Sequence, residues 1–167
     1  AYSGAQIIHP KTITPLQNKN IPLYVRPFGD KRKPGTVIRG MSAPVDVPIL
    51  ILKKDQVLLT IRSRDFSFVL EEKFATIFSL LERFRVKTNL IHNSAVNLSL
   101  CVDNSWHIDE AVGALREAGF DVMKAERMEL LTVRGYTPEL WRRYAVGPQV
   151  FVRQATQATV RIVRKRE

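Results

Sequence analysis

The residue types that most often carry catalysis or bind metals are scattered along this chain. Its histidines, His9, His92 and His107, stand far apart and show no metal-ligand spacing such as H-x-x-x-H. No two glycines lie closer than five positions, as Gly35 and Gly40 do, so no glycine-rich loop could cradle a phosphate. No Ser/His/Asp set is favoured by its spacing. We therefore predict no catalytic residue, no metal site and no cofactor in this chain.

The single cysteine, Cys101, is predicted to be a passive thiol. It falls on the polar phase of an alternating strand, and neither a helix N-terminus nor a basic sequence neighbour is there to activate it. A lone cysteine also excludes a disulfide framework and a zinc site built from cysteines.

The composition is that of an ordinary globular protein. The chain has 167 residues, of which 45% are hydrophobic and 25% charged, enough for one large domain or two small ones. No apolar run approaches the roughly 20 residues that a membrane span needs, and the chain does not start with a basic segment followed by an apolar one. We expect no membrane partner and a cytoplasmic location.

The charge balance is strongly basic. Lysine and arginine number 26 against 16 acidic residues, a net charge of +10, which could favour a polyanionic partner. The basic clusters are short, at residues 31–33 and 164–166, and no aromatic residues interleave with them as stacking platforms would. We therefore expect no nucleic-acid partner and keep a basic nucleic-acid binder as a minor alternative. The charge is also compatible with a fragment whose missing part carries the acidic residues.

The middle of the chain predicts a complete α+β unit. A buried strand at residues 56–63 is followed by a helix whose apolar positions recur at helical spacing over residues 74–84. Strands are predicted at residues 87–93 and 96–103, the second alternating between a core face and a polar face. A second helix, with Ser105 as N-cap and Gly119 as its stop, leads to a strand at residues 121–128. The order βαββαβ is the ferredoxin-like arrangement, with two helices on one face of a four-stranded antiparallel sheet.

The flanks contain the elements of a second, trimmed unit. Short strands are predicted near residues 20–28 and 36–39 on one side of the central unit. On the other side we predict strands at residues 129–134, 150–152 and 158–163, and a helix that begins with the cap Thr137 and Pro138. Neither flank alone can form a core. Together they could form a second sheet into which the central unit is inserted.

Several segments resemble aspartokinases. The N-terminal run Gly4-Ala-Gln-Ile-Ile-His-Pro-Lys-Thr-Ile13 is the most specific, and further matches lie at residues 20–25, 34–38, 58–63, 74–84 and 89–94. In that family the first of these stretches joins the kinase domain to regulatory ACT domains, and one ACT unit lies within another. The resemblance thus implies a linker or helix at residues 1–20, a second ACT-like unit at 21–50 and 129–167, and a central ACT domain at 51–128.

The resemblance also implies a function. The chain would be the regulatory, feedback-sensing part of an aspartate kinase, with the catalytic domain missing and no enzymatic activity of its own. The parent enzyme would phosphorylate L-aspartate with ATP and Mg²⁺ in lysine, threonine and methionine biosynthesis. The partners implied are an amino-acid effector, lysine in preference to threonine, a second copy of the chain in a homodimer, and the kinase domain.

The resemblance places the effector site around the first loop of the central unit. Backbone N–H groups at the positive end of a helix suit the carboxylate of a free amino acid. In similar aspartokinases an aspartate near the start of the next strand commonly holds the ammonium, and Asn89 stands at the matching position. Changes at two further matching positions loosen feedback inhibition in the family. The site residues implied are Asp65, Phe66, Ser67, Phe68, Val69, Leu70, Lys87, Thr88, Asn89, Asn93 and Ser94.

The sequence departs from this pattern in two ways. Asn89 is neutral, and a neutral acceptor contributes about 0.5–1.5 kcal/mol, against about 1.5–3 kcal/mol for a charged one. Glu72 stands where some relatives carry glycine, and the loop is one residue longer. Two alternatives follow: the asparagines are solvated strand-end residues and the phenylalanines only pack, or the chain is a dimerisation module that has lost effector binding.

Overall fold

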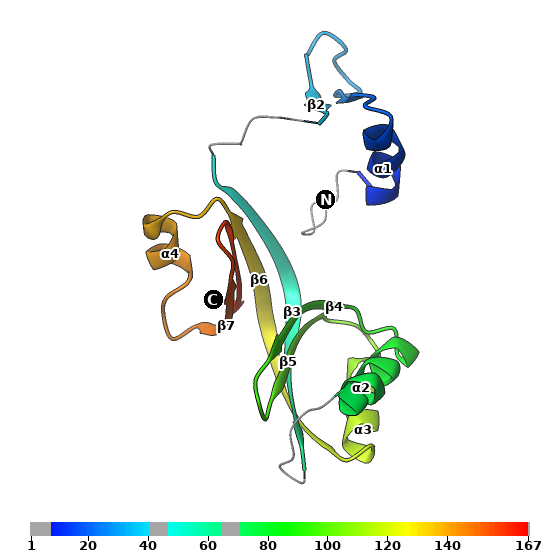
Figure 1. Cartoon of the computed structure of the whole chain (residues 1–167), viewed down its shortest axis with the longest axis vertical. Helices are drawn as coiled ribbons and strands as arrows, with labels where there is room; N and C mark the ends of the chain where they lie inside the picture. The colour runs from blue at the N-terminus through cyan, green and yellow to red at the C-terminus, as the bar shows by residue number, and fades with distance from the viewer. Residues whose placement is uncertain (1–7, 41–46, 65–70, 167) are drawn as a thin grey trace. The chain divides into compact units, whose positions relative to one another are not determined.

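The computed structural model describes residues 8–40, 47–64 and 71–166. The chain divides into two compact units, residues 1–47 and 48–167 (Figure 1). Each unit is described here by itself.

The first unit contains one helix and a two-stranded ribbon. Helix α1 (Pro10–Asn18) is capped by His9, whose Nδ1 accepts a hydrogen bond from the backbone N–H of Lys11 at 3.2 Å. Strands β1 (Leu23–Val25) and β2 (Thr36–Ile38) pair antiparallel with each other. Gly35 precedes β2 with φ +70°, and a Cβ there would clash with the carbonyl oxygen of Val25.

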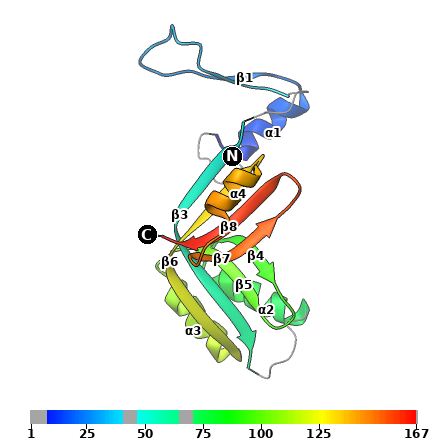
Figure 2. The same ribbon diagram turned by 90° about the vertical axis from the view of Figure 1, so that its left-hand side faces the viewer.

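The second unit is built on one antiparallel sheet of six strands. Their order in the sheet is β4-β5-β3-β6-β8-β7 (Figures 1 and 2). In chain order its elements are β3 (Ile49–Ser63), α2 (Glu71–Arg83), β4 (Thr88–Asn93), β5 (Leu98–Asp103), α3 (Ile108–Glu117), β6 (Phe120–Arg134), α4 (Pro138–Tyr144), β7 (Val150–Ala155) and β8 (Thr159–Lys165).

The sheet contains the same arrangement twice. The elements β3-α2-β4-β5-α3-β6 give the strand order β4-β5-β3-β6, which is ferredoxin-like. The elements β6-α4-β7-β8 give the order β7-β8-β6-β3, with the start of β3 as the fourth strand. Strands β3 and β6 therefore belong to both halves of the sheet. The predicted α+β fold, with a complete central unit inserted in a trimmed one, is confirmed.

Paired irregularities separate the two halves. The register between β3 and β6 shifts between Lys53 and Gln56 and again between Gln56 and Leu58. Asp55 and Arg127 have φ of 54° and 59° at this level, a left-handed conformation that is uncommon in residues other than glycine. We call this level of the sheet the junction.

Both faces of the sheet are covered. Helices α2 and α3 pack on one face over residues such as Leu59, Ile61 and Leu100, and α4 packs over Val133 and Ile162. The other face forms a third core, which joins both halves: Leu58, Leu90, Cys101, Met128, Leu130, Val152 and Val163. The prediction that β5 has one polar face is therefore wrong at Cys101, which is fully buried because β7 and β8 pack against that face.

The last two strands also make hydrogen bonds with β4, at the other end of the strand order (Figure 2). Nη2 of Arg161, on β8, donates to the backbone oxygen of Asn89 at 2.6 Å. Nε2 of Gln154, on β7, donates to the backbone oxygen of Ile91 at 3.1 Å. The sheet is therefore curled so that its two edge strands come close together.

Two details differ from the sequence predictions. Strands β1 and β2 pair only with each other, so residues 21–38 are not strands of the six-stranded sheet, whereas the start of β3 is. Ser105 is not the N-cap of α3: the cap is His107, and the Oγ of Ser105 is buried without a hydrogen-bond partner among the described residues. Two other predictions hold, since Thr137 Oγ1 accepts from Leu140 N at 3.3 Å and Gly119 follows α3 with φ +93°.

Candidate functional site

The predicted effector loop, Asp65 to Leu70, lies outside the described residues. The residues on either side of it are described. The N–H of Arg64 donates to the backbone oxygen of Gly119 at 3.3 Å. The Nζ of Lys73, on α2, donates to Oγ of Ser63 at 2.6 Å. These bonds fix the end of β3 against the α3–β6 turn and the first turns of α2.

An open hollow of about 440 Å³ lies at this end of the sheet. Its charged residues are Arg64 and Lys73, and a carboxylate ligand would meet two positive charges there. The lining residues are Ser63, Arg64, Lys73, Thr76, Ala118, Gly119 and Phe120.

The other predicted site residues lie at opposite ends of β4. Asn93 pairs with Leu98, which also pairs with Ile61, so Asn93 is at the same end of the sheet as Ser63. Thr88 pairs with Val102 at the junction end. A strand rises about 3.3 Å per residue, so roughly 16 Å separate the ends of β4. Within one chain, Asn93 and Ser94 therefore lie at the end of the sheet that carries the hollow, although two strands from β3, and Lys87, Thr88 and Asn89 lie at the opposite end of β4.

Ser94 has a local structural role. Its Oγ accepts from Asn97 N at 3.2 Å, and its backbone N–H donates to Asn97 O at 2.9 Å, which closes the β4–β5 turn. Asn93 is exposed and makes no side-chain hydrogen bond within the described part of the chain. Lys87 is exposed and Thr88 half-buried.

Asn89 lies in a bulge of β4 and uses its whole side chain within the protein. Its Nδ2 donates to Oε1 of Gln56 at 2.7 Å and to Oδ1 of Asp103 at 2.8 Å. Its Oδ1 accepts from Nζ of Lys53 at 2.8 Å, and the same Nζ is 2.7 Å from Oδ1 of Asp103. We call Lys53, Gln56, Asn89 and Asp103 the Asn89 cluster. An ammonium of the protein itself thus lies where the sequence predicted that of a ligand.

The cluster determines how its carboxylate titrates. Burial acts to raise the pKa of Asp103, but the hydrogen bonds from Lys53, Gln56 and Asn89 outweigh it and hold that pKa below its ordinary value. Asp103 is therefore an anion at neutral pH, balanced by Lys53.

Cys101 lies beside the cluster. Its Sγ is 3.6 Å from Oε1 of Gln56, and burial raises the pKa of the thiol to about 12. The thiol is therefore neutral and inert at physiological pH, as the sequence predicted on other grounds.

Sequence reasoning missed Lys53, Gln56 and Asp103 as the partners of Asn89. They come from two other strands, and a single sequence shows no link between them and residue 89. Only the strand pairing that aligns Gln56 with Asp103 brings them together.

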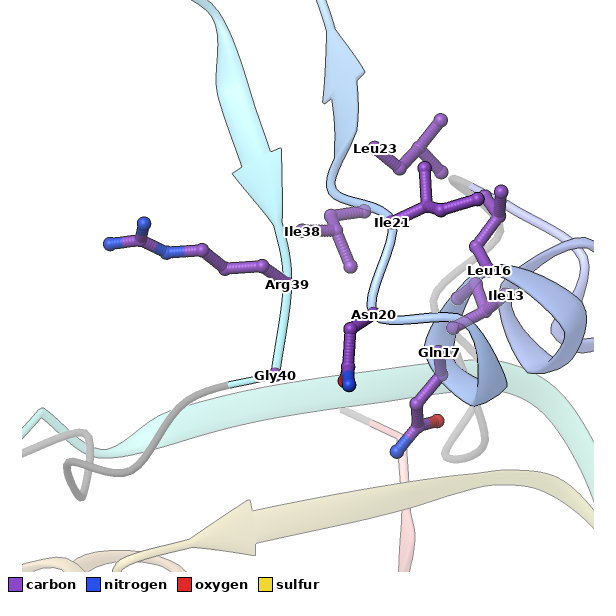
Figure 3. A pocket seen from close by; sticks show the side chains of 9 residues that line it. All are labelled: Ile13, Leu16, Gln17, Asn20, Ile21, Leu23, Ile38, Arg39 and Gly40. Atoms are coloured by element: carbon purple, nitrogen blue, oxygen red, sulfur yellow. The ribbon is translucent and has the colours of Figure 1, made fainter.

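The first unit has a pocket of its own, of about 180 Å³ (Figure 3). It is lined mainly by aliphatic side chains of α1, β1 and β2, and the only charged lining residue, Arg39, points away from them. Such a lining suits an apolar side chain rather than an amino acid. The lining residues are Ile13, Leu16, Gln17, Asn20, Ile21, Leu23, Ile38, Arg39 and Gly40.

Two features are absent from the described residues. They contain no helix long and apolar enough to cross a membrane. They also contain no group of three or more His, Cys, Asp or Glu side chains that could hold a metal ion.

Comparisons with known proteins find aspartokinases among those similar to this chain. No protein-family model matches the chain. Aspartokinase 3, chloroplastic, of Arabidopsis thaliana is 33% identical over 112 residues, 63% of this chain and 19% of the relative. Lysine-sensitive aspartokinase 3 of Escherichia coli is 30% identical over 105 residues, 61% of this chain and 23% of the relative. The chain is homologous to the C-terminal, regulatory region of aspartokinases.

Solved structures agree on the fold. Aspartokinase III of E. coli in complex with lysine and aspartate aligns with a TM-score of 0.72 at 24% identity, covering 98% of this chain and 40% of that one. A putative C-terminal regulatory domain of aspartate kinase from Porphyromonas gingivalis aligns with a TM-score of 0.58 at 19% identity, covering 72% of this chain and 88% of that one. The chain spans about a fifth of the length of the curated relatives above.

Proposed function

We propose that this chain is an allosteric sensor that binds an end-product amino acid in the hollow at the end of β3. The observation that carries the proposal is that two cations, Arg64 and Lys73, line a hollow and stand on either side of the predicted effector loop in the sequence. Lysine is proposed in preference to threonine because one relative is named lysine-sensitive and one structural neighbour was solved with lysine.

The expected affinity is modest. A ligand of roughly ten heavy atoms reaches micromolar to millimolar dissociation constants within the limits of ligand efficiency. To act as a regulator, the amino acid must bind one conformation of the protein more tightly, and couplings of about 1–3 kcal/mol are typical.

We further propose that the sensor is a homodimer. In one chain, residues 87–89 lie about a strand length from the end of the sheet that carries the hollow. A second copy in the opposite orientation would bring that end of its β4 beside the hollow of the first. The predicted site residues would then be shared between two chains, and ligand binding would be coupled to their association.

The activity of the whole protein follows from the family. We propose that it phosphorylates L-aspartate with ATP and Mg²⁺ in the cytoplasm, on the way to lysine, threonine and methionine, and that the kinase domain is the sensor's partner in the same chain.

The site is tested by isothermal titration of the 167-residue chain with L-lysine and with L-threonine. We expect heat of binding with lysine, and a loss of about tenfold or more in affinity for Arg64→Gln because a charged partner of the carboxylate is removed. Arg142→Gln is the matched control, since Arg142 is exposed in the last turn of α4. No heat with either amino acid, or equal weakening by both substitutions, would contradict the proposal.

The Asn89 cluster favours a second candidate, a dimerisation module without effector binding. Lys53 already occupies the acceptor that the sequence assigned to the ligand's ammonium. A dimer in sedimentation velocity together with flat titrations would select this candidate.

A further inference from the structure

A second polar pocket lies at the junction, and the proposed sensor site does not use it. Its volume is about 270 Å³. It is lined by Lys54, Glu129, Gln149, Arg164, Lys165 and Arg166.

The lining carries a net positive charge. Four of the six residues are cations and Glu129 is the only anion, so the sum is +3. Glu129 is 7% exposed, and its Oε1 accepts from both Nε and Nη2 of Arg164 at 2.7 Å. The opposite charges of Glu129 and Arg164 therefore cancel each other. The excess charge therefore belongs to Lys54, Lys165 and Arg166, which are exposed and form no ion pair with any other described residue.

The backbone holds these three cations together. Lys54 lies in the irregular part of β3, between Lys53 and Gln56. The N–H of Lys165 donates to Gln149 O at 3.0 Å, and the N–H of Arg166 donates to Arg127 O at 2.8 Å. The backbone positions of the three residues are therefore fixed by strand pairing and loop contacts, so a ligand would have to order only their side chains.

We propose that this pocket binds a phosphate-bearing anion. Three cations around one cavity, without an ion pair to any described residue, favour a ligand with more than one negative charge and no positive group. A free amino acid does not fit this description, because its ammonium would face a site of net charge +3. Liquid water occupies roughly 30 Å³ per molecule, so the cavity has room for about nine waters, which is enough for a diphosphate group.

The test measures binding of sodium pyrophosphate and of inorganic phosphate to the 167-residue chain by isothermal titration, at constant ionic strength. The variant Lys54→Gln/Lys165→Gln removes two lining charges. The control Lys31→Gln/Lys33→Gln removes the same charge from exposed positions of the first unit. We expect pyrophosphate to bind the parent chain more tightly than phosphate, about tenfold or more weaker binding by the pocket variant, and less than a twofold change in the control.

Two further measurements test whether the pocket variant is still folded and whether the pocket prefers phosphate groups to carboxylates. The pocket variant should keep the parent's thermal midpoint without ligand, since both lysines are exposed and unpaired. L-glutamate, which carries carboxylates and an ammonium, should compete poorly with pyrophosphate. No binding by the parent chain would overturn the proposal. Equal weakening in both variants would also overturn it, because net charge rather than the pocket would then explain binding.

Discussion

The side-chain amide of Asn89, at the start of β4, is a hydrogen-bond donor and a hydrogen-bond acceptor at the same time. Its nitrogen faces two acceptors, Gln56 Oε1 and Asp103 Oδ1, and its oxygen faces the ammonium of Lys53. A carboxylate at this position could satisfy Lys53 but could not donate to the other two. The family's aspartate and this chain's asparagine are therefore not equivalent here, because the surrounding cluster already holds one carboxylate.

This asymmetry predicts that Asn89→Asp destabilises the protein at neutral pH. Two hydrogen bonds would become contacts between acceptors, one of them between two carboxylates, and the attraction to Lys53 would offset only part of the loss. We expect the free energy of unfolding to fall by about 1–3 kcal/mol, measured from urea denaturation at pH 7.

Asn93→Asp is the matched control for that experiment. It makes the same change on the same strand at an exposed position, and we expect an effect within about 0.5 kcal/mol. If Asn89→Asp were as stable as the parent chain, the cluster would not hold Asn89 in the way described.

The site could be predicted from the sequence only where the family supplied a template. The resemblance pointed to residue 89, and the structure shows that this residue has a special environment. The ammonium of Lys53 and the separate surroundings of residues 89 and 93 could not be predicted, because both depend on which strands are neighbours.

At the scale of elements, the sequence predicted helices correctly where their formation depends on residues that are close together in the chain. Helix α2 (Glu71–Arg83) was predicted from apolar spacing over residues 74–84, and α4 from Thr137 followed by Pro138. Ser105 was a false cap because α3 begins two residues later than its sequence suggests, after a turn in which Ile108 N donates to Ser105 O at 3.2 Å. A capping residue is recognisable by type, but its register with the first helical turn is set by the preceding turn.

The two candidate caps predict opposite responses to the same substitution. Thr137→Ala removes the acceptor for Leu140 N and should lower the free energy of unfolding by about 1 kcal/mol. Ser105→Ala removes a buried hydroxyl that has no partner in the described structure, so stability should stay the same or rise. Thermal and urea unfolding of both variants measure this, and a loss in Ser105→Ala comparable to that in Thr137→Ala would show that Ser105 is a cap after all.

The long strands could not be predicted as single elements, because the bulges change the phase of the hydrophobic pattern. On the face that carries the helices, β3 places even-numbered residues before the junction, such as the exposed Leu52, which pairs with Leu131, and odd-numbered residues such as Leu59 after it. Strand β6 changes phase in the same way, between Val122 and Leu131. A strand with period two is expected to keep its phase. The sequence pattern therefore predicted two short strands, at residues 121–128 and 129–134, where β6 lies, and only residues 56–63 of β3. Because each bulge adds one residue to a strand, the hydrophobic side chains before and after it lie on the same face of the sheet.

At the scale of the whole second unit, the two halves of the sheet share more than strands β3 and β6. Val152 and Val163 come from the second half, and they are buried in the same core as Leu58, Leu90 and Cys101 from the first. The bonds from Arg161 and Gln154 to the backbone of β4 close this core at its edge. An inserted module that were merely tethered would have no such common core, and could unfold alone.

The shared core predicts that the two halves unfold together, and Val163→Ala is the variant that tests it. Val163 is fully buried, and removing two methyl groups from such a position costs about 1.5–3 kcal/mol once the cavity is included. Because the core is common, hydrogen exchange followed by mass spectrometry in increasing urea should show the same reduced midpoint for peptides of β4–β5 and of β7–β8. Val37→Ala, on the exposed ribbon of the first unit, should leave both midpoints unchanged. If Val163→Ala lowered only the midpoint of β7–β8, the halves would be independent, and a signal from the proposed amino-acid site could not be transmitted through the third core.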